Sequence, residues 1–149
     1  MNIAPLKLTA LCDKSSFRLG SSILVQVKLS NASAHPIWIN KRMGVGYEDS
    51  MVREIFFTVY DASTGRVIPA PEDERVDAHR LPPSRGDFQQ LGPGDAADVV
   101  VDLSYWYRFK LAGNYQIIFT YDNHYDGGEF GVKAFKGKVT SNPVDVTLD

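Results

Sequence analysis

One short segment carries oxygen-bearing side chains at the spacing of a calcium-binding loop. The four residues concerned are Asp122, His124, Asp126 and Glu129. Oxygen ligands at alternate positions followed by glycine, here Gly127, are typical of the start of a calcium loop. However, His124 occupies a position that requires oxygen, and the twelfth position is Lys133 rather than glutamate. The pattern therefore favours a polar hairpin that turns at Asp126-Gly127, and we predict no metal site.

The histidines and the known catalytic motifs give no support for an enzyme. His35, His79 and His124 lie far apart, each in an expected loop, so convergence on zinc is not expected. The sequence contains no His-Glu-x-x-His motif, no Gly-x-Ser-x-Gly motif and no phosphate-binding glycine loop. Asp98 and Asp102 fit outward positions of a solvated strand. We therefore predict no catalytic residues, no cofactor and no enzymatic activity.

Aromatic residues cluster in the segment Tyr105-Trp106-Tyr107, and Trp38 is a further candidate. Exposed together, such rings could form a stacking platform for sugars. Aromatic residues of a β-sandwich more often fill its core, and we expect Trp38 to be the buried tryptophan between the sheets.

A second candidate for binding is the glycine-containing segment Gly44-Val45-Gly46-Tyr47, within a polar stretch at residues 40–53. A rigid loop of this kind could wedge into the cleft of an enzyme. The partner-binding residues that we predict are Gly44, Val45, Gly46, Tyr47, Tyr105 and Trp106.

Bulk properties exclude several classes of partner. The 149 residues fit one domain, and the net charge of −2 comes from charges of both signs scattered along the chain. This distribution argues against nucleic-acid binding and against a polybasic membrane anchor. No apolar run reaches the length of a membrane span. Cys12 is the only cysteine, so it cannot form an intramolecular disulfide.

The sequence is compatible with more than one cellular compartment. The first residues, Met1 to Pro5, show neither a basic segment nor a long apolar segment, so we expect no signal peptide. Taken at face value the protein is cytoplasmic. A secreted or periplasmic domain from which a signal peptide has been removed would look the same.

Alternation of apolar and polar residues predicts half-buried antiparallel strands. The inward rows that we expect are Ile23, Val25, Val27 and Leu29; Ile55, Phe57 and Val59; Ala97, Val99, Val101 and Leu103; Tyr115, Ile117, Phe119 and Tyr121; and Val144, Val146 and Leu148. Residues 6–12 form an expected edge strand, and residues 36–39 a short one. The sequence thus predicts one all-β domain over 1–149, an immunoglobulin-like antiparallel β-sandwich of seven to nine strands.

The connections carry further expectations. Residues 61–65 should form a hairpin turn, with a return strand at 66–68. Ser104 could cap a helical turn over residues 105–110. Tyr115 is placed as a tyrosine corner at the start of the penultimate strand. Residues 69–90 and 123–137 are expected to form long loops, the first of them mobile.

Several turn and corner motifs of the C-terminal half occur together in a known family. They are Pro93-Gly-Asp, Val101-Asp-Leu-Ser104, Tyr107, Ala112-Gly-Asn-Tyr115, Tyr121 and Ser141-Asn-Pro-Val144. The combination resembles bacterial and fungal immunoglobulin-like domains such as the N-terminal domain of deuterolysin-type metalloendopeptidases. A looser likeness is to small intracellular proteinase inhibitors with the same sandwich. The chain departs from the pattern at Ala112, where proline is preferred, and at Asp95, where glutamate is preferred.

These observations together predict a non-catalytic protein-interaction module that presents loops at the ends of a rigid sandwich. The resemblance implies a proteinase inhibitor or a protease-associated domain as the most specific version, with a protease as the partner. The alternative is a carbohydrate-binding module that uses exposed aromatic residues. An edge strand such as residues 6–12 also allows a weak homodimer by strand pairing.

Overall fold

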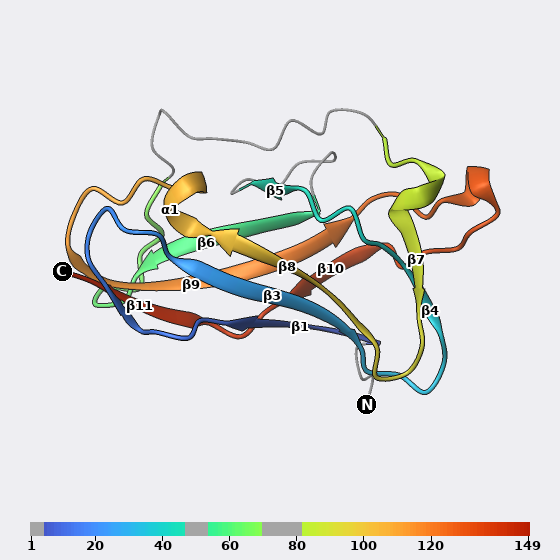
Figure 1. Cartoon of the computed structure of the whole chain (residues 1–149), viewed down its shortest axis with the longest axis horizontal. Coiled ribbons are helices and arrows are strands. Elements are labelled where there is room, and N and C mark those ends of the chain that lie inside the picture. Colours follow the sequence, from blue (N-terminus) through green and yellow to red (C-terminus); the bar gives the residue numbers. More distant parts are fainter. Residues whose placement is uncertain (1–4, 47–53, 70–81) are drawn as a thin grey trace.

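The computed structural model describes residues 5–46, 54–69 and 82–149, and these form an all-β sandwich. Two sheets make its layers, and a small two-stranded sheet lies at one end (Figure 1). No helix in these three ranges has the length and apolar character needed to cross a bilayer.

The first layer is an antiparallel sheet of three strands in the order β1-β3-β8. Its strands are β1 (Leu6–Leu11), β3 (Leu24–Asn31) and β8 (Ala96–Asp102). Leu6 lies opposite Asn31 at one end of the β1–β3 pair, and Leu24 lies opposite Asp102 on the other side of β3. The expected strand at residues 6–12 is therefore an edge strand.

The second layer is built around β9 (Gly113–Asn123), the longest strand. The sheet order is β2-β11-β9-β6-β5, and β10 also pairs with β9. The remaining strands are β2 (Ser16–Phe17), β5 (Val45–Gly46), β6 (Ile55–Asp61), β10 (Gly137–Thr140) and β11 (Val144–Leu148). β10 and β11 follow one another along the same side of β9, so they act as two halves of one interrupted strand.

The small sheet pairs β4 (Ile37–Asn40) with β7 (Phe88–Leu91). The helical segments are η1 (Arg85–Asp87), α1 (Leu103–Trp106) and η2 (Gly128–Phe130). The described residues thus hold eleven strands, of which β2 and β5 have only two residues each. The other nine agree with the seven to nine strands predicted from the sequence.

The expected inward rows do form the core. Every member of the rows on β6 and β11, and of the row at residues 23–29, is less than 9% exposed. Val25, Val27, Ile117 and Phe119 are each 0% exposed. Burying a side chain of this size stabilises the fold by roughly 1.5–3 kcal/mol. Burial of alternate residues therefore accounts for the choice of strands over helices.

The tyrosine corner predicted at Tyr115 is present. The Tyr115 Oη donates a hydrogen bond of 2.6 Å to the main-chain oxygen of Leu111, four residues upstream. The ring of Tyr115 also packs edge-on against Phe109, with the ring centroids 5.0 Å apart. The bond ties the segment that crosses between the layers to the start of β9.

Several local predictions were wrong. The return strand expected at residues 66–68 is a single bridge between Tyr60 and Val67. The cap of α1 is Asp102 rather than Ser104, because the Asp102 carboxylate accepts a hydrogen bond from the Ser104 amide, and the helix ends at Trp106. Trp38 is half-buried on β4, not a central core residue.

The long loop expected at residues 69–90 is partly ordered. Residues 85–91 form η1 and then β7, because β7 finds main-chain partners on β4. Residues 70–81 of that predicted loop lie outside the described residues. In the second predicted loop, β9 extends to Asn123 and β10 begins at Gly137.

Substituting the corner tyrosine tests its contribution to stability. We expect Tyr115→Phe to lower the free energy of unfolding by about 1 kcal/mol, because the ring still packs but the hydrogen bond to Leu111 is lost. In a protein of this size this corresponds to a fall in Tm of roughly 2–4 °C. Thermal and urea denaturation measure the change. Tyr60→Phe, on the outer face of β6, is the control, and an equal loss there would contradict the prediction.

Candidate functional site

The first two residues of the segment predicted to wedge into a partner, Gly44 and Val45, are buried. Val45 is 5% exposed and Gly44 is also buried, because β5 pairs in parallel with β6 at the edge of the second sheet. The Gly44 oxygen accepts hydrogen bonds from the amides of Glu54 and Ile55. Gly44 and Val45 therefore do not form an exposed binding loop. Tyr47 lies outside the described residues, and Gly46 is the last residue of β5.

A buried ion pair fixes the approach to β5. The Arg42 guanidinium contacts both carboxylate oxygens of Glu54, with Nε to Oε1 at 3.1 Å and Nη2 to Oε2 at 2.8 Å. The Arg42 and Glu54 side chains are 7% and 2% exposed. Glu54 Oε1 also accepts the Gly44 amide at 3.0 Å. The hydrogen bond to Glu54 raises the pKa of Arg42, so the guanidinium stays charged.

The backbone between the ion pair and β5 takes an unusual conformation. Met43 has a φ of +49°, and it is the only residue other than glycine with positive φ among the described residues. Its side chain is buried, at 5% exposure. A residue with a side chain is held in the left-handed region only when its surroundings over-determine it. Here the Glu54 carboxylate provides that constraint, because it binds Arg42 and Gly44 on either side.

A polar network continues from this pair into the core. The Tyr121 Oη donates to the Asn40 oxygen at 2.9 Å and accepts from the Asn40 amide at 3.2 Å. The Asn40 Nδ2 donates to Asn123 Oδ1 at 3.2 Å. Burial raises the pKa of Tyr121 far above its usual value, so it acts only as a neutral hydroxyl. The network joins β4 to β9 and plays a structural part.

Sequence analysis missed this network. Residues 40–53 were interpreted as a polar loop, and Tyr121 as a plain core residue. The one available signal was Glu54, a charged residue placed directly before the apolar strand β6. Its partner Arg42 lies twelve residues away, across a stretch without periodicity, so no spacing rule identifies it.

The predicted hairpin after β9 brings only part of the calcium-like set together. Asp122 is buried, and its Oδ2 lies 3.1 Å from His124 Nε2 and 4.0 Å from Lys138 Nζ. Asp126 instead accepts the Gly128 amide within its own turn, at 2.9 Å. Within the described ranges, no three His, Cys, Asp or Glu side chains are grouped to hold a metal ion.

The aromatic pair predicted to bind a partner lies on α1, which follows β8 directly (Figure 1). Tyr105 is 51% exposed and Trp106 is half-buried. Their ring centroids are 4.9 Å apart and the ring planes are 82° apart. Two perpendicular rings present no common flat surface for stacking. The Asp102 carboxylate also accepts the Ser104 hydroxyl at 2.7 Å, which holds the start of α1 in place.

An open pocket of about 730 Å³ lies beyond α1, between residues 61–69 and residues 107–115. Its apolar lining includes Ile68, Tyr107, Phe109 and Leu111. Leu111 is 73% exposed, the highest value among the exposed large hydrophobic residues of the described chain. The volume is within the range of ligand-binding pockets. Sequence analysis did not find this pocket, because its walls come from two connections that are far apart in the chain.

Tyr107 links the pocket to the core. Its ring contacts Phe109, with centroids 4.7 Å apart, and meets Phe57 edge-on at 6.5 Å. Its Oη donates to the Pro69 oxygen at 3.1 Å. Burial raises the pKa of Tyr107 to about 12. The floor of the pocket is therefore a rigid extension of the hydrophobic core.

Comparison with models of known protein families and with curated proteins found no match to this chain. The arguments on function therefore depend on the geometry. Of the six predicted partner-binding residues, Tyr105 and Trp106 lie together on α1, directly before the pocket residue Tyr107. Val45 and Gly46 form β5, and Gly44 precedes it.

A double-mutant cycle tests the buried ion pair. We expect Glu54→Gln alone to lower the free energy of unfolding by about 3 kcal/mol, because Arg42 stays charged and buried without its counter-ion. Adding Arg42→Met should recover part of this loss, so the two effects are not additive. Urea denaturation of the four proteins measures the coupling. The matched control is Glu129→Gln, an exposed site. Additive effects would show that the pair is not coupled.

The raised pKa of Tyr107 predicts a loss of stability in alkali. Because the folded protein holds this proton more tightly than the unfolded chain, the contribution is complete below pH 10. It is lost as the pH rises from 10 to 12. We expect the free energy of unfolding to fall over this range, and Tyr107→Phe to make the fall less steep. Urea denaturation at several pH values measures it, and an unchanged slope would contradict the assignment.

Proposed function

We propose that this protein is a non-catalytic interaction module that binds another protein through the α1 end of the sandwich. The observation that carries the proposal is the 73% exposure of Leu111 in the lining of a preformed apolar pocket. Tyr105, which is 51% exposed, lies on α1, the helix that ends directly before the pocket residue Tyr107. Apolar side chains are usually left in water singly, whereas apolar residues gathered at a pocket are typical of binding surfaces. The rigid aromatic floor under Phe109 supports binding without a large ordering cost.

The charged groups at the pocket are suited to recognition rather than to acid–base chemistry. Arg108 and Lys110 line the pocket beside its apolar residues. The carboxylate of Asp61 accepts hydrogen bonds from the Ser63 amide and hydroxyl, which lower the pKa of Asp61. Asp61 therefore stays ionised in a turn of its own. A cationic rim around an apolar centre suits a protein partner with an apolar anchor and flanking acidic residues.

A carbohydrate-binding module is the weaker alternative. Tyr105 is exposed enough to stack on a sugar ring, but the perpendicular arrangement with Trp106 limits such a platform to a single ring. The proteinase inhibitor is the most specific version of the main proposal. Its inserted loop would then be residues 107–112 rather than Gly44 to Tyr47, since Gly44 and Val45 are buried.

Affinity capture with matched variants tests the α1 end. The baits are the unaltered protein, Tyr105→Ser/Leu111→Ser and, as a control of equal chemistry, Leu11→Ser on β1, where Leu11 is 55% exposed. Loss of an apolar anchor weakens an interface by about 1.5–3 kcal/mol, or roughly 10- to 100-fold. We expect one partner to be retained by the unaltered protein and by Leu11→Ser, and to be lost with the double variant.

Equal recovery of every captured protein by the three baits would contradict the proposal. A panel of metallo-, cysteine and serine proteases then tests the inhibitor version. Inhibition at micromolar protein that disappears with Leu111→Ser would support that version. A partner that is captured without inhibition of any protease would leave the interaction module as the better description.

A further inference from the structure

In the described part of the chain, several edges of the two main sheets are short or covered. The second sheet ends in β2 and β5, which have two residues each. In the first sheet, Asn142 covers the outer edge of β1: its Oδ1 accepts the Ala10 amide and its Nδ2 donates to the Ala10 oxygen, both at 2.9 Å. Leu8 is bridged to Ser141 on the same edge. Short or covered edges prevent unwanted strand pairing.

The outer side of β8 is an edge that no other described strand covers. The main-chain bonds to β3 are made by odd-numbered residues, since the Asn31 amide donates to Asp95 and the Leu103 amide donates to Ile23. In an antiparallel ladder the residues between them point the opposite way. The main-chain groups of Ala96, Asp98 and Val100 therefore face outward. Among residues 5–46, 54–69 and 82–149, no strand pairs with this side of β8.

We propose that β8 accepts an extended segment of a partner protein as an added strand, with Lys or Arg at alternate positions on the solvent face. The inference rests on the proposed function, because it names how the interaction module would engage its partner. Strand addition takes affinity from main-chain hydrogen bonds and specificity from alternate side chains. β8 has seven residues, which is enough for a regular ladder.

The charge on β8 selects the chemistry of the added strand. Asp98 lies on the outer face, where its Oδ2 accepts a hydrogen bond from Gln26 Nε2 at 2.7 Å and Lys28 lies opposite it on β3. The Asp102 carboxylate is held at the start of α1 by the Ser104 amide and hydroxyl, so Asp98 is the main charge along the edge. Val100, between the two, is 61% exposed. Leu24, opposite Asp102 on β3, is 53% exposed. Oppositely charged residues directly across a strand pair stabilise it, and like charges destabilise it. A basic side chain opposite Asp98 and an apolar one near Val100 therefore fit this edge.

A second copy of this chain fits less well. Antiparallel pairing of two β8 strands about Val100 would place Asp98 opposite Asp102 of the other copy. Pairing about Asp98 would place the two Asp98 carboxylates opposite each other, and pairing about Val99 would leave them as diagonal neighbours. Each arrangement brings like charges together across the pair.

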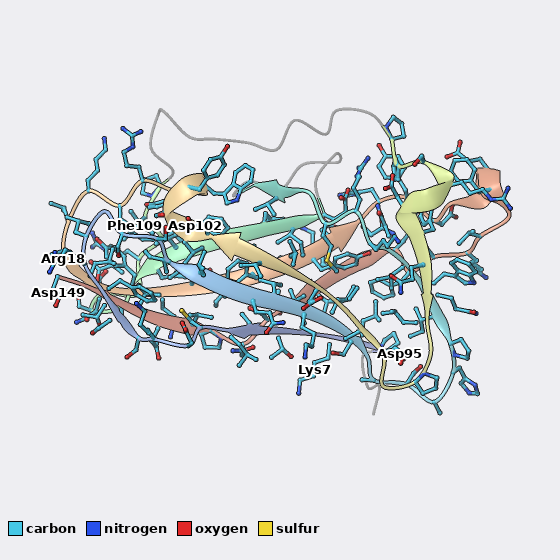
Figure 2. The ribbon with its side chains drawn as sticks, viewed as in Figure 1. Lys7, Arg18, Asp95, Asp102, Phe109 and Asp149 are labelled. Carbon is cyan, nitrogen blue, oxygen red and sulfur yellow. The ribbon has the colours of Figure 1, made fainter. Side chains whose placement is uncertain are left out.

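The open edge is continuous with the aromatic end. Asp102 is the last residue of β8 and the cap of α1, so a strand that follows β8 to its end reaches α1 (Figure 1). Asp95 and Asp102 mark the two ends of the edge in Figure 2, with Asp102 at the same end as Phe109. One partner could therefore pair with β8 and place an apolar residue in the pocket.

Peptide titration followed by NMR tests the proposal. The probe is an eight-residue peptide, acetylated and amidated, in which Lys alternates with Val and Thr. The matched peptide has Glu in place of each Lys. At low salt we expect the Lys peptide to shift the backbone amide signals of Ala96, Asp98 and Val100 and to slow their hydrogen exchange. The Glu peptide should leave these signals unchanged.

Two variants locate the interaction. Val100→Pro removes an outward amide that makes no ladder bond to β3, and we expect it to abolish the shifts. Asp98→Asn keeps the edge intact, and we expect it to weaken binding of the Lys peptide about two- to fivefold. The control is Lys7→Asn on β1, which projects on the margin opposite α1 in Figure 2 and should bind as the unaltered protein does.

Each other outcome overturns the inference. Shifts confined to residues 105–115 would leave the interaction module in place but remove strand addition, as would no shift at millimolar peptide. Equal binding of the Lys and Glu peptides would contradict the preference for a basic partner segment. Protection of the β8 amides without peptide, together with a dimer in sedimentation, would assign the edge to a second copy. The capture experiment is independent of all these results.

Discussion

The fold depends on the burial of one face of β9 in the core between the two sheets. β9 pairs with β6 on one side and with β11 and then β10 on the other, so it holds the second layer together. Its residues Ile117, Phe119 and Tyr121 are 0% exposed, as are Val25 and Val27 on the facing layer. Shifting β9 or β3 by one residue in its sheet would turn its buried row toward water, so the burial of these rows fixes the register of both sheets.

The architecture was predictable because the buried residues alternate with polar ones along each strand, which gives the sequence a period of two. Ile23 to Leu29 and Tyr115 to Tyr121 are inward-facing as expected, and the hydroxyl of Tyr115 makes the expected corner bond. The resemblance that favoured deuterolysin-type domains rests on such turn and corner residues. These residues serve the sandwich itself, and for that reason they say little about a partner.

The parts that were missed depend on contacts that are distant in sequence. Arg42 with Glu54, Asn40 with Tyr121, and Asn142 with Ala10 each join residues that no periodic pattern relates. Gly44 and Val45 were taken for an exposed loop because their sequence is polar and glycine-rich around them. The Glu54 carboxylate instead holds this segment against β6. A sequence motif cannot show this contact, because its two sides come from separate parts of the chain.

An uncovered edge such as that of β8 does not destabilise the fold. Main-chain groups at an edge are hydrated, so stability does not require that they be covered, and closing an edge mainly prevents association. Asn142 closes β1 in this way. On β8 the charge of Asp98 would serve the same purpose, because it disfavours pairing between copies of a chain that carries a net charge of −2. A carboxylate that repels its own copy would attract a basic segment, so in the proposed strand addition this one residue would both protect the edge and select its occupant.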